Sequence, residues 1–263
     1  MKIVFSDLDG TILDFSSYSY DESLDGIELL KKNKVPLILV SNKTFPEMKG
    51  IHRELRLHDP FIFENGGGIA YPANNKEGDN FKIEYTGKGI DVLKEKFKIL
   101  KAISTVPVKS IYEMEIGEII ERTNLSGKSI ELLSDRAASI PFVASSSADQ
   151  FDINAANSAL ETNGVFIIKG GRFYHLVSTG VDKGSAVRKV TEYIKRNSSG
   201  AEKIVTVGLG DSESDLSMLK EVDIPFLIRK PDGSIIKADF EVIVTRNIGP
   251  GGFTEAVKSI FAG

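Results

Sequence analysis

The chain contains no cysteine among its 263 residues, which excludes disulfides, thiolate metal sites and cysteine nucleophiles. It also lacks any run of about 18 apolar residues, so no segment is predicted to span a bilayer. There is no basic surplus, because 33 Lys and Arg stand against 37 Asp and Glu, a formal net charge of -4. This balance argues against a nucleic-acid partner and against a protein that binds anionic membranes.

The N-terminal sequence MKIVFSDLDG reaches Asp7 before the apolar core of a signal peptide could form, so we expect a cytoplasmic protein. A hydrophobic content of 41% is high enough for a real core and excludes wholesale disorder. At roughly 150 residues per domain, the length predicts between one and two domains.

Short apolar runs alternate with segments of helical spacing at both ends of the chain. The runs are continuous, as in parallel strands that are covered on both faces. The expected strands are 3–5, 37–40, 61–63, 204–207, 226–228 and 242–244, and the expected helices are 21–32, 46–57, 181–197 and 214–222. This alternation predicts an α/β fold with a doubly wound, mostly parallel sheet.

The middle of the chain has longer helical patterns and is predicted to be a separate α+β domain inserted into the first. The expected helices there are 90–103, 112–123, 129–138 and 148–162, and the expected strands are 82–85, 141–144, 165–168 and 172–176. We therefore predict a core of residues 1–80 plus 178–263 and an insertion of residues 81–177. The linkers are expected at 74–80 and 178–180.

Two acidic motifs follow predicted core strands. Asp7 and Asp9 are two residues apart on an extended segment, so both carboxylates can point the same way. Asp211 and Asp215 lie in a strand-to-helix turn, one helical turn apart. Each motif alone is also explained by an ordinary turn or helix cap.

Two further motifs add anion-binding groups. Ser41 ends a strand, where an exposed hydroxyl and backbone N–H groups can hold an anion. Lys183 begins a helix, where a cation gains nothing from the helix dipole unless an anion lies in front of it. In open α/β sheets ligands bind at the carboxyl ends of the strands, so all four motifs should meet at one edge. Oxygen ligands beside a lysine and a hydroxyl favour Mg²⁺ and a phosphoryl group.

In this order the motifs resemble the haloacid dehalogenase superfamily of phosphotransferases. The matching stretches are FSDLDGT (5–11), VSNKT (40–44), VDKG (181–184) and GLGDSESD (208–215), and the insertion resembles the α/β cap of the family. A finer resemblance is to mannosyl-3-phosphoglycerate phosphatases. It depends on ENGGG (64–68), GGRFYHL (170–176) and the sequence that follows Gly208.

The resemblance implies that Asp7 is a nucleophile that forms an aspartyl-phosphate. Asp9 is then the general acid and base, Ser41 and backbone N–H groups hold the phosphoryl oxygens, and Lys183 with Mg²⁺ offsets the charge of Asp7. The implied magnesium ligands are the Asp7 carboxylate, the Asp9 backbone carbonyl and Asp211. Asp215 is expected to orient Lys183 or ligand waters from outside this set.

The expected substrate contacts lie partly in the core and partly in the cap. They are Thr11, Asn42, Lys43, Arg136, Gly170, Gly171 and Arg172. Arg172 is the preferred partner for a glycerate carboxylate because its planar fork pairs in a bidentate manner. On one regular strand Arg172 and His175 would lie on opposite faces, so His175 is expected to be structural.

Two positions depart from the resemblance, namely Ile140 where an acid is expected and Asn42 where a serine is usual. The preferred function is a phosphatase for mannosyl-3-phosphoglycerate or its glucosyl analogue. The alternatives are a phosphatase for another sugar phosphate or for phosphoglycolate, a phosphomutase, and a non-enzymatic phospho-acceptor module. Asp9 argues against the phospho-acceptor module, because a second carboxylate hastens hydrolysis of the aspartyl-phosphate. The oligomeric state stays open.

Overall fold

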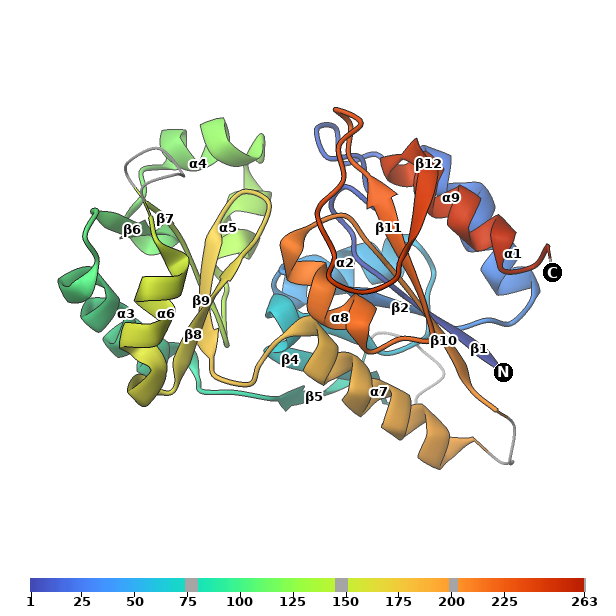
Figure 1. Ribbon diagram of the computed structural model, residues 1–263, viewed down its shortest axis with the longest axis horizontal. Helices are drawn as coiled ribbons and strands as arrows, with labels where there is room; N and C mark the ends of the chain where they lie inside the picture. The colour runs from blue at the N-terminus through green and yellow to red at the C-terminus, as the bar shows by residue number, and fades with distance from the viewer. Residues whose placement is uncertain (74–79, 145–150, 199–202, 263) are drawn as a thin grey trace.

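Residues 1–73, 80–144, 151–198 and 203–262 are described by the computed structural model, and they form two lobes (Figure 1). The core lobe is built on an eight-stranded sheet in the order β12-β11-β10-β1-β2-β3-β4-β5. Its strands are β1 (Lys2–Ser6), β2 (Leu37–Val40), β3 (Phe61–Phe63), β4 (Gly68–Pro72), β5 (Phe81–Tyr85), β10 (Val205–Gly210), β11 (Ile224–Arg229) and β12 (Ile243–Ile248).

The strands from β12 to β3 are all parallel, whereas β4 and β5 add an antiparallel edge. The chain winds outward from β1 through β2 and β3 on one side, and from β10 through β11 and β12 on the other. The prediction of a doubly wound, mostly parallel sheet is confirmed. The carboxyl ends of β1 and β10 lie at its switch point, where ligands bind in such folds.

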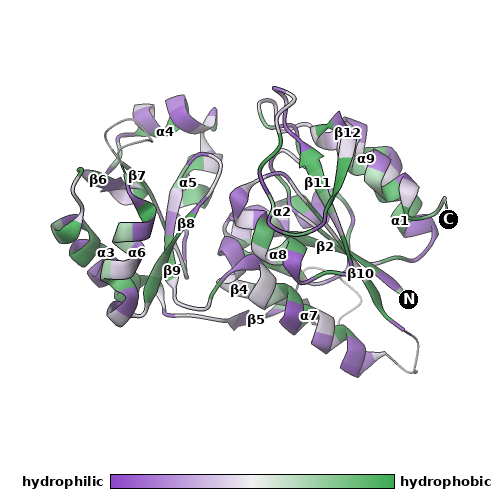
Figure 2. Cartoon of the chain, in the orientation of Figure 1, coloured by the Kyte–Doolittle hydropathy of each residue, from purple (hydrophilic) through white to green (hydrophobic). Residues whose placement is uncertain are grey.

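Helices cover both faces of this sheet, as the continuous apolar runs predict. On one face lie α1 (Leu24–Lys32), α2 (Phe45–Glu54) and α9 (Gly249–Ser259), and on the other lie α7 (Lys183–Asn197) and α8 (Leu216–Lys220). Val4 packs toward α1 and α9, whereas its neighbours Ile3 and Phe5 pack toward α7 and α8. Residues 3–5 of β1 and all of β2 are accordingly apolar (Figure 2), and this double burial fixes β1 and the loop that follows it.

The second lobe is an antiparallel sheet in the order β6-β7-β9-β8, with helices on both faces. Its strands are β6 (Val108–Ser110), β7 (Ile140–Ala144), β8 (Val165–Lys169) and β9 (Tyr174–Ser178). Its helices are α3 (Ile90–Ile103) and α6 (Ile153–Leu160) on one face and α4 (Ile116–Thr123) and α5 (Lys128–Ser134) on the other. The predicted α+β insertion is confirmed as a fold, and we call this lobe the cap.

Short 3₁₀ helices complete the described elements: η1 (Asp21–Ser23), η2 (Glu64–Gly66), η3 (Ile111–Glu113), η5 (Glu161–Asn163) and η6 (Glu213–Asp215). None of the helices that the structure describes is long and apolar enough to cross a membrane.

The expected start of the insertion at residue 81 is wrong, because β5 pairs with β4 in the core sheet. The chain enters the cap after Tyr85 and returns after Ser178, where the Lys88 N–H donates to the Ser178 hydroxyl at 2.7 Å. The two connections thus lie side by side. Of the predicted linker at 74–80, residues 74–79 lie outside the described residues, as do residues 148–150 of the predicted helix 148–162.

Two predicted cap helices are shorter than expected. The segment 112–123 is interrupted at Met114, which is extended, so α4 begins at Ile116. The segment 129–138 leaves the helix after Ser134, and the Ala137 and Ala138 N–H groups donate to Glu64 of the core. A contact between the lobes therefore overrides local helical propensity.

Two strands, β4 and β6, and one α-helix, α9, are absent from the sequence prediction. The strands β4 and β6 are short, and β4 begins at a glycine. The helix α9 begins Gly-Pro-Gly-Gly, a composition that predicts a turn. It forms because Phe253, Ala256 and Val257 are buried against the sheet, and tertiary burial outweighs weak propensity.

Glu64 connects the core to the cap through three hydrogen bonds. The residue is fully buried. Its carboxylate accepts hydrogen bonds from Ala137 N at 2.8 Å, Ala138 N at 3.0 Å and Ser139 Oγ at 2.7 Å. A buried carboxylate is tolerated only where such donors replace water. Glu64 therefore determines where the cap segment 137–139 lies on the core.

The change Glu64→Ala should lower the free energy of unfolding by about 3 kcal/mol, because it leaves three buried donors without their acceptor. Urea denaturation measures this difference. The matched control is Glu95→Ala, since Glu95 pairs with Lys98 at 2.7 Å while both side chains are about two thirds exposed. A loss no larger than that of the control would contradict the role given to Glu64.

Candidate active site

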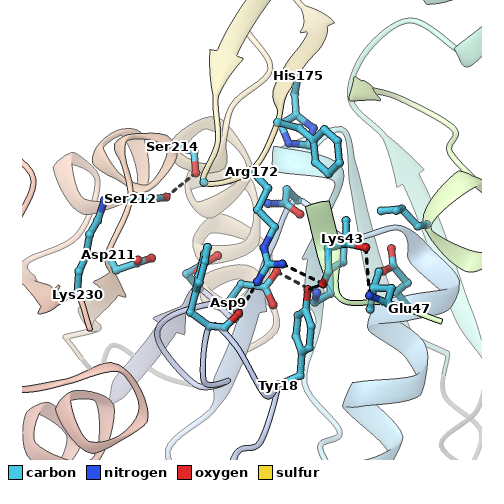
Figure 3. A pocket seen from close by; sticks show the side chains of 18 of the residues that line it. Asp9, Tyr18, Lys43, Glu47, Arg172, His175, Asp211, Ser212, Ser214 and Lys230 are labelled. Carbon is cyan, nitrogen blue, oxygen red and sulfur yellow. Dashed lines mark hydrogen bonds and ion pairs between the residues drawn. The ribbon is translucent and has the colours of Figure 1, made fainter. Parts of the chain in front are cut away.

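A cavity of about 330 Å³ lies between the core and the cap, at the carboxyl ends of β1, β2 and β10 (Figure 3). The core lines it with Asp7, Asp9, Asn42, Lys43, Lys183 and Asp211, among others. The cap lines it with Arg136, Gly171, Arg172 and His175, among others. The four sequence motifs therefore do meet at one edge of the sheet. A concave site with convergent polar groups is the usual form of a small-molecule site.

At the floor of this cavity Lys183 connects Asp7, near the N-terminus, to Asp215, in the C-terminal part of the chain. Its ammonium donates to Asp7 Oδ1 at 2.7 Å and to Asp215 Oδ1 at 2.6 Å. Burial by itself would lower the pKa of Lys183, but Asp215 and Asp7 outweigh it and raise the pKa above its ordinary value. The side chain is therefore a permanent cation, and α7 begins with it because Asp182 caps the helix through Ser185 N.

Asp215 has both oxygens occupied by the protein. Oδ1 accepts from Lys183, and Oδ2 accepts from the N–H groups of Asp211 and Ser212 and from the Ser212 hydroxyl. Asp215 thus contacts the lysine and the turn between β10 and α8 at once. Gly10 has a φ of +84°, and a Cβ there would lie 2.7 Å from Asp211 Oδ2. Only glycine allows this approach.

The carboxylates of Asp7, Asp211 and Asp215 form a buried acidic cluster; the protein occupies both oxygens of Asp215, so Asp7 and Asp211 are the two that fit a divalent cation. One oxygen of each lies within 4.8 Å of the others, and all three residues are buried. Burial, and then repulsion from Asp215, raises the pKa of Asp7 well above its ordinary value despite the nearby Lys183. Burial and Asp215 likewise raise the pKa of Asp211 to about 7. A hard dication would offset this excess negative charge, and carboxylate oxygens are the ligands that Mg²⁺ prefers.

Asp9 lies beside this acidic set and forms a pair of its own. Its Oδ2 is 2.9 Å from the Lys43 ammonium, while its Oδ1 is buried with no hydrogen-bond partner among the described residues. Burial would lower the pKa of Lys43, but Asp9 and Glu47 raise it above its ordinary value. The Lys43 ammonium also lies 5.1 Å from the centre of the Tyr18 ring. Asp9 thus lines the cavity with one oxygen paired to Lys43 and the other unpaired within the described residues.

The prediction that Ser41 exposes its hydroxyl is wrong, because this residue is only 1% exposed. The loop at residues 64–68 covers the end of β2, where Asn65 N donates to Ser41 O. Thr11 is also fully buried, and its hydroxyl has no partner in the described part of the chain. Neither residue is among the described ones that line the cavity, so both lie behind its wall.

Arg136 serves mainly to connect the lobes. Its Nη1 donates to the Asn42 carbonyl of the core at 2.7 Å and to Ser139 Oγ at 3.2 Å, and its Nε donates to Leu133 O at 3.0 Å. Gly170 closes the turn between β8 and β9 by donating to Phe173 O, and Gly171 but not Gly170 is part of the described wall. Ile140 is buried in the cap core, so the departure from the family pattern there does not touch the cavity directly.

Arg172 lies in the turn before β9, which begins at Tyr174, so the expectation of opposite faces for Arg172 and His175 is wrong. Both residues line the cavity. The Arg172 guanidinium donates to Thr123 O at 2.9 Å within the cap and to Phe15 O of the core. It also lies over the rings of Phe15 and Tyr18, at 4.3 and 5.3 Å from their centres. The predicted pairing with a carboxylate would compete with these contacts.

His175 is 2% exposed, and its Nδ1 has no hydrogen-bond partner among the described residues. Burial, and then Arg136 and Lys183, lowers its pKa well below the ordinary value, so the imidazole is neutral at physiological pH.

Sequence reasoning missed Tyr18, Phe15 and Lys230, which also line the cavity. Tyr18 has a φ of +59°, which is costly for an aromatic residue, and its hydroxyl donates to Thr123 O of the cap at 2.7 Å. No motif marks this loop, because its position depends on the closed arrangement of the two lobes.

Residues 4–249 match the family of haloacid dehalogenase-like hydrolases. The chain is 37% identical over 232 residues to the glucosyl-3-phosphoglycerate/mannosyl-3-phosphoglycerate phosphatase of Persephonella marina, covering 86% of this chain and 84% of that protein. It is 33% identical to the enzyme of the same name from Methanococcoides burtonii, covering 98% and 96%. A haloacid dehalogenase-like hydrolase from Bacteroides thetaiotaomicron has the same fold, with a TM-score of 0.67, 16% identity and 99% coverage of both chains.

Magnesium should stabilise the protein more at about pH 8 than at about pH 5. A carboxyl group whose pKa rises on folding, here Asp211 from 3.8 to about 7, contributes stability below its ordinary pKa. That contribution is lost as the pH rises toward about 7, where the folded carboxyl groups become charged and able to bind a cation. Thermal unfolding with magnesium chloride or EDTA measures the shift in Tm. In Asp211→Asn the pH dependence should shrink, and an equal shift at both pH values in the wild type would contradict the site.

The change Arg172→Ala should raise KM about tenfold for substrates that fill the cavity, whether or not they carry a carboxylate, because it removes the hydrogen bond from the cap to Phe15 O of the core together with the bonds to the Arg122 and Thr123 carbonyls that hold the guanidinium in place. Arg172→Lys should rescue little, since it keeps the charge but not the planar fork. Steady-state kinetics on a glycosyl-3-phosphoglycerate and on a glycosylglycerol phosphate measure this. The control is Lys169→Ala, which removes an exposed tie to Glu213 across the lobes. A loss confined to the carboxylate-bearing substrate would instead support the pairing expected from sequence.

Proposed function

The chain belongs to the haloacid dehalogenase-like hydrolases and is a phosphatase, and we propose that it is a magnesium-dependent enzyme that dephosphorylates mannosyl-3-phosphoglycerate or the glucosyl analogue. The observation that carries the proposal is the buried pair of Asp7 and Lys183 beside Asp211, at the floor of a cavity closed by the cap. The two curated relatives, similar over most of the chain, support the choice of substrate.

Asp7 is the proposed nucleophile. Its Oδ1 accepts from Lys183, which leaves Oδ2 to attack phosphorus as the bond between phosphorus and the ester oxygen breaks. Asp9 donates a proton to the departing oxygen of the glycosylglycerate. It then takes a proton from a water molecule that attacks the aspartyl-phosphate; the bond between phosphorus and Asp7 breaks, phosphate leaves, Asp7 is again a carboxylate and Asp9 regains the proton it gave.

The remaining side chains balance charge around the phosphoryl group. A magnesium ion held by the carboxylates of Asp7 and Asp211 and by the Asp9 carbonyl would offset the negative charge of the nucleophile and the phosphate. Lys183 neutralises the phosphoryl oxygens from the other side, and Asp215 holds Lys183 in place. Because Lys183 is buried, its charge acts at short range with little screening by water.

The proposed substrate contacts divide into two groups. Asn42, Lys43 and Gly171 line the cavity and can contact the glycosylglycerate directly. Ser41 and Thr11 lie behind the wall, and Gly170 closes the turn between β8 and β9, so we propose that they shape the loops around the substrate. Arg136 and Arg172 close the cap over the substrate and exclude bulk water from the aspartyl-phosphate.

The test is phosphate release from a panel of phosphate monoesters, with magnesium or with EDTA. Release from mannosyl- or glucosyl-3-phosphoglycerate, abolished by EDTA and by Asp7→Asn, is expected. The nucleophile variant should lose at least about a thousandfold in kcat. Asp25→Asn is the control, because Asp25 is 79% exposed on α1.

Other outcomes would point elsewhere. Turnover spread over hexose phosphates or phosphoglycolate would overturn the substrate. Little free phosphate, with a requirement for a bisphosphate activator, would indicate a mutase. Full activity in Asp7→Asn would remove the nucleophile assignment.

A further inference from the structure

Lys230 lies at the carboxyl end of β11, the strand next to β10, and lines the cavity beside Asp211 and Ser212 (Figure 3). The turn that follows holds its backbone in place. Lys230 N donates to Ser234 O at 3.0 Å, and Gly233 N donates to Lys230 O at 2.9 Å. Gly233 has a φ of +79°, which permits this tight turn. The side chain therefore extends from a fixed point.

Four other cations that line the cavity are committed to groups of the protein. Lys183 is paired with Asp7 and Asp215, and Lys43 is paired with Asp9. Arg136 and Arg172 donate chiefly to backbone carbonyls, some in the cap and some in the core. Within residues 1–73, 80–144, 151–198 and 203–262, the Lys230 ammonium has neither an ion pair nor a hydrogen bond.

The two acids near Lys230, Asp232 and Asp211, do not form an ion pair with its ammonium. Asp232 turns its Oδ1 to the N–H and hydroxyl of Ser234, at 2.9 and 2.6 Å. Asp211 belongs to the proposed metal set. Neither carboxylate lies within ion-pair distance of Lys230. An ammonium has three donors and no acceptor, so an uncommitted one in a cavity suits an anion better than a neutral hydroxyl.

We propose that Lys230 binds the carboxylate of the substrate and so selects phosphate esters that carry a second anionic group. This inference rests on the proposed function, whose substrate has one phosphate and one carboxylate. Lys183 and the acidic set with its cation account for the phosphate, and the carboxylate still needs a partner. Lys230 is the cation on the described wall that can take this role without breaking a bond within the protein.

The test compares two ligands that differ at the carboxylate, 3-phosphoglycerate and glycerol 3-phosphate. Each competes with p-nitrophenyl phosphate, or with whichever monoester the enzyme turns over, and its Ki is measured. The wild type should prefer 3-phosphoglycerate. Lys230→Ala should reduce that preference about tenfold, which corresponds to about 1.4 kcal/mol. Lys230→Arg, which keeps the charge, should restore part of it.

Lys237→Ala is the matched control, because Lys237 is exposed in the same loop and is not among the described residues that line the cavity. It should leave the preference unchanged. An unchanged preference in Lys230→Ala would overturn the proposal, and so would an equal loss for both ligands, which would assign Lys230 to the phosphate or to the fold. Absence of a preference in the wild type would overturn it too.

The same data separate this proposal from the proposed function. A preference that depends on Lys230, in an enzyme that does not hydrolyse glycosyl-3-phosphoglycerates, would reject the substrate but retain the carboxylate contact. Hydrolysis of these substrates with no effect of Lys230 would do the reverse.

Discussion

The buried ammonium of Lys183 is the interaction on which the site depends. Two carboxylates separated by more than 200 residues, Asp7 and Asp215, would repel each other in the interior without it. The lysine satisfies both, and its own burial is tolerated only because both are there. The ends of β1 and β10 and the start of α7 are thereby fixed relative to one another. A proposed nucleophile and a proposed metal site follow from this one arrangement.

A second constraint is the placement of the cap. Glu64 accepts three donors from the cap, and Arg136 and Arg172 donate from the cap to core carbonyls. These contacts are largely hydrogen bonds rather than packed apolar surface. They depend on direction and are lost if the lobes separate by a few ångströms.

The charges in the cavity are organised as close pairs of opposite sign rather than as a surplus of one sign. Lys43 offsets Asp9 and Lys183 offsets Asp7, while burial and Asp215 raise the pKa of Asp211. The neutral His175 and the stacked Arg172 form the cap wall on the other side. A site of this kind suits a ligand that brings several negative charges together with a divalent cation.

The order of residue types along the chain by itself determined the parallel core sheet, the inserted cap and the four motifs that meet at the edge of the core sheet. Continuous apolar runs and turn residues are local signals, and strand order then places Asp7, Ser41, Lys183 and Asp211 near one another. Tertiary structure alone decided which side chains face the cavity. Ser41 is covered by a loop from another part of the chain, Arg172 is turned to core carbonyls, and β5 joins the core sheet. The physical reason is that orientation and burial depend on partners distant in sequence, which local periodicity does not encode.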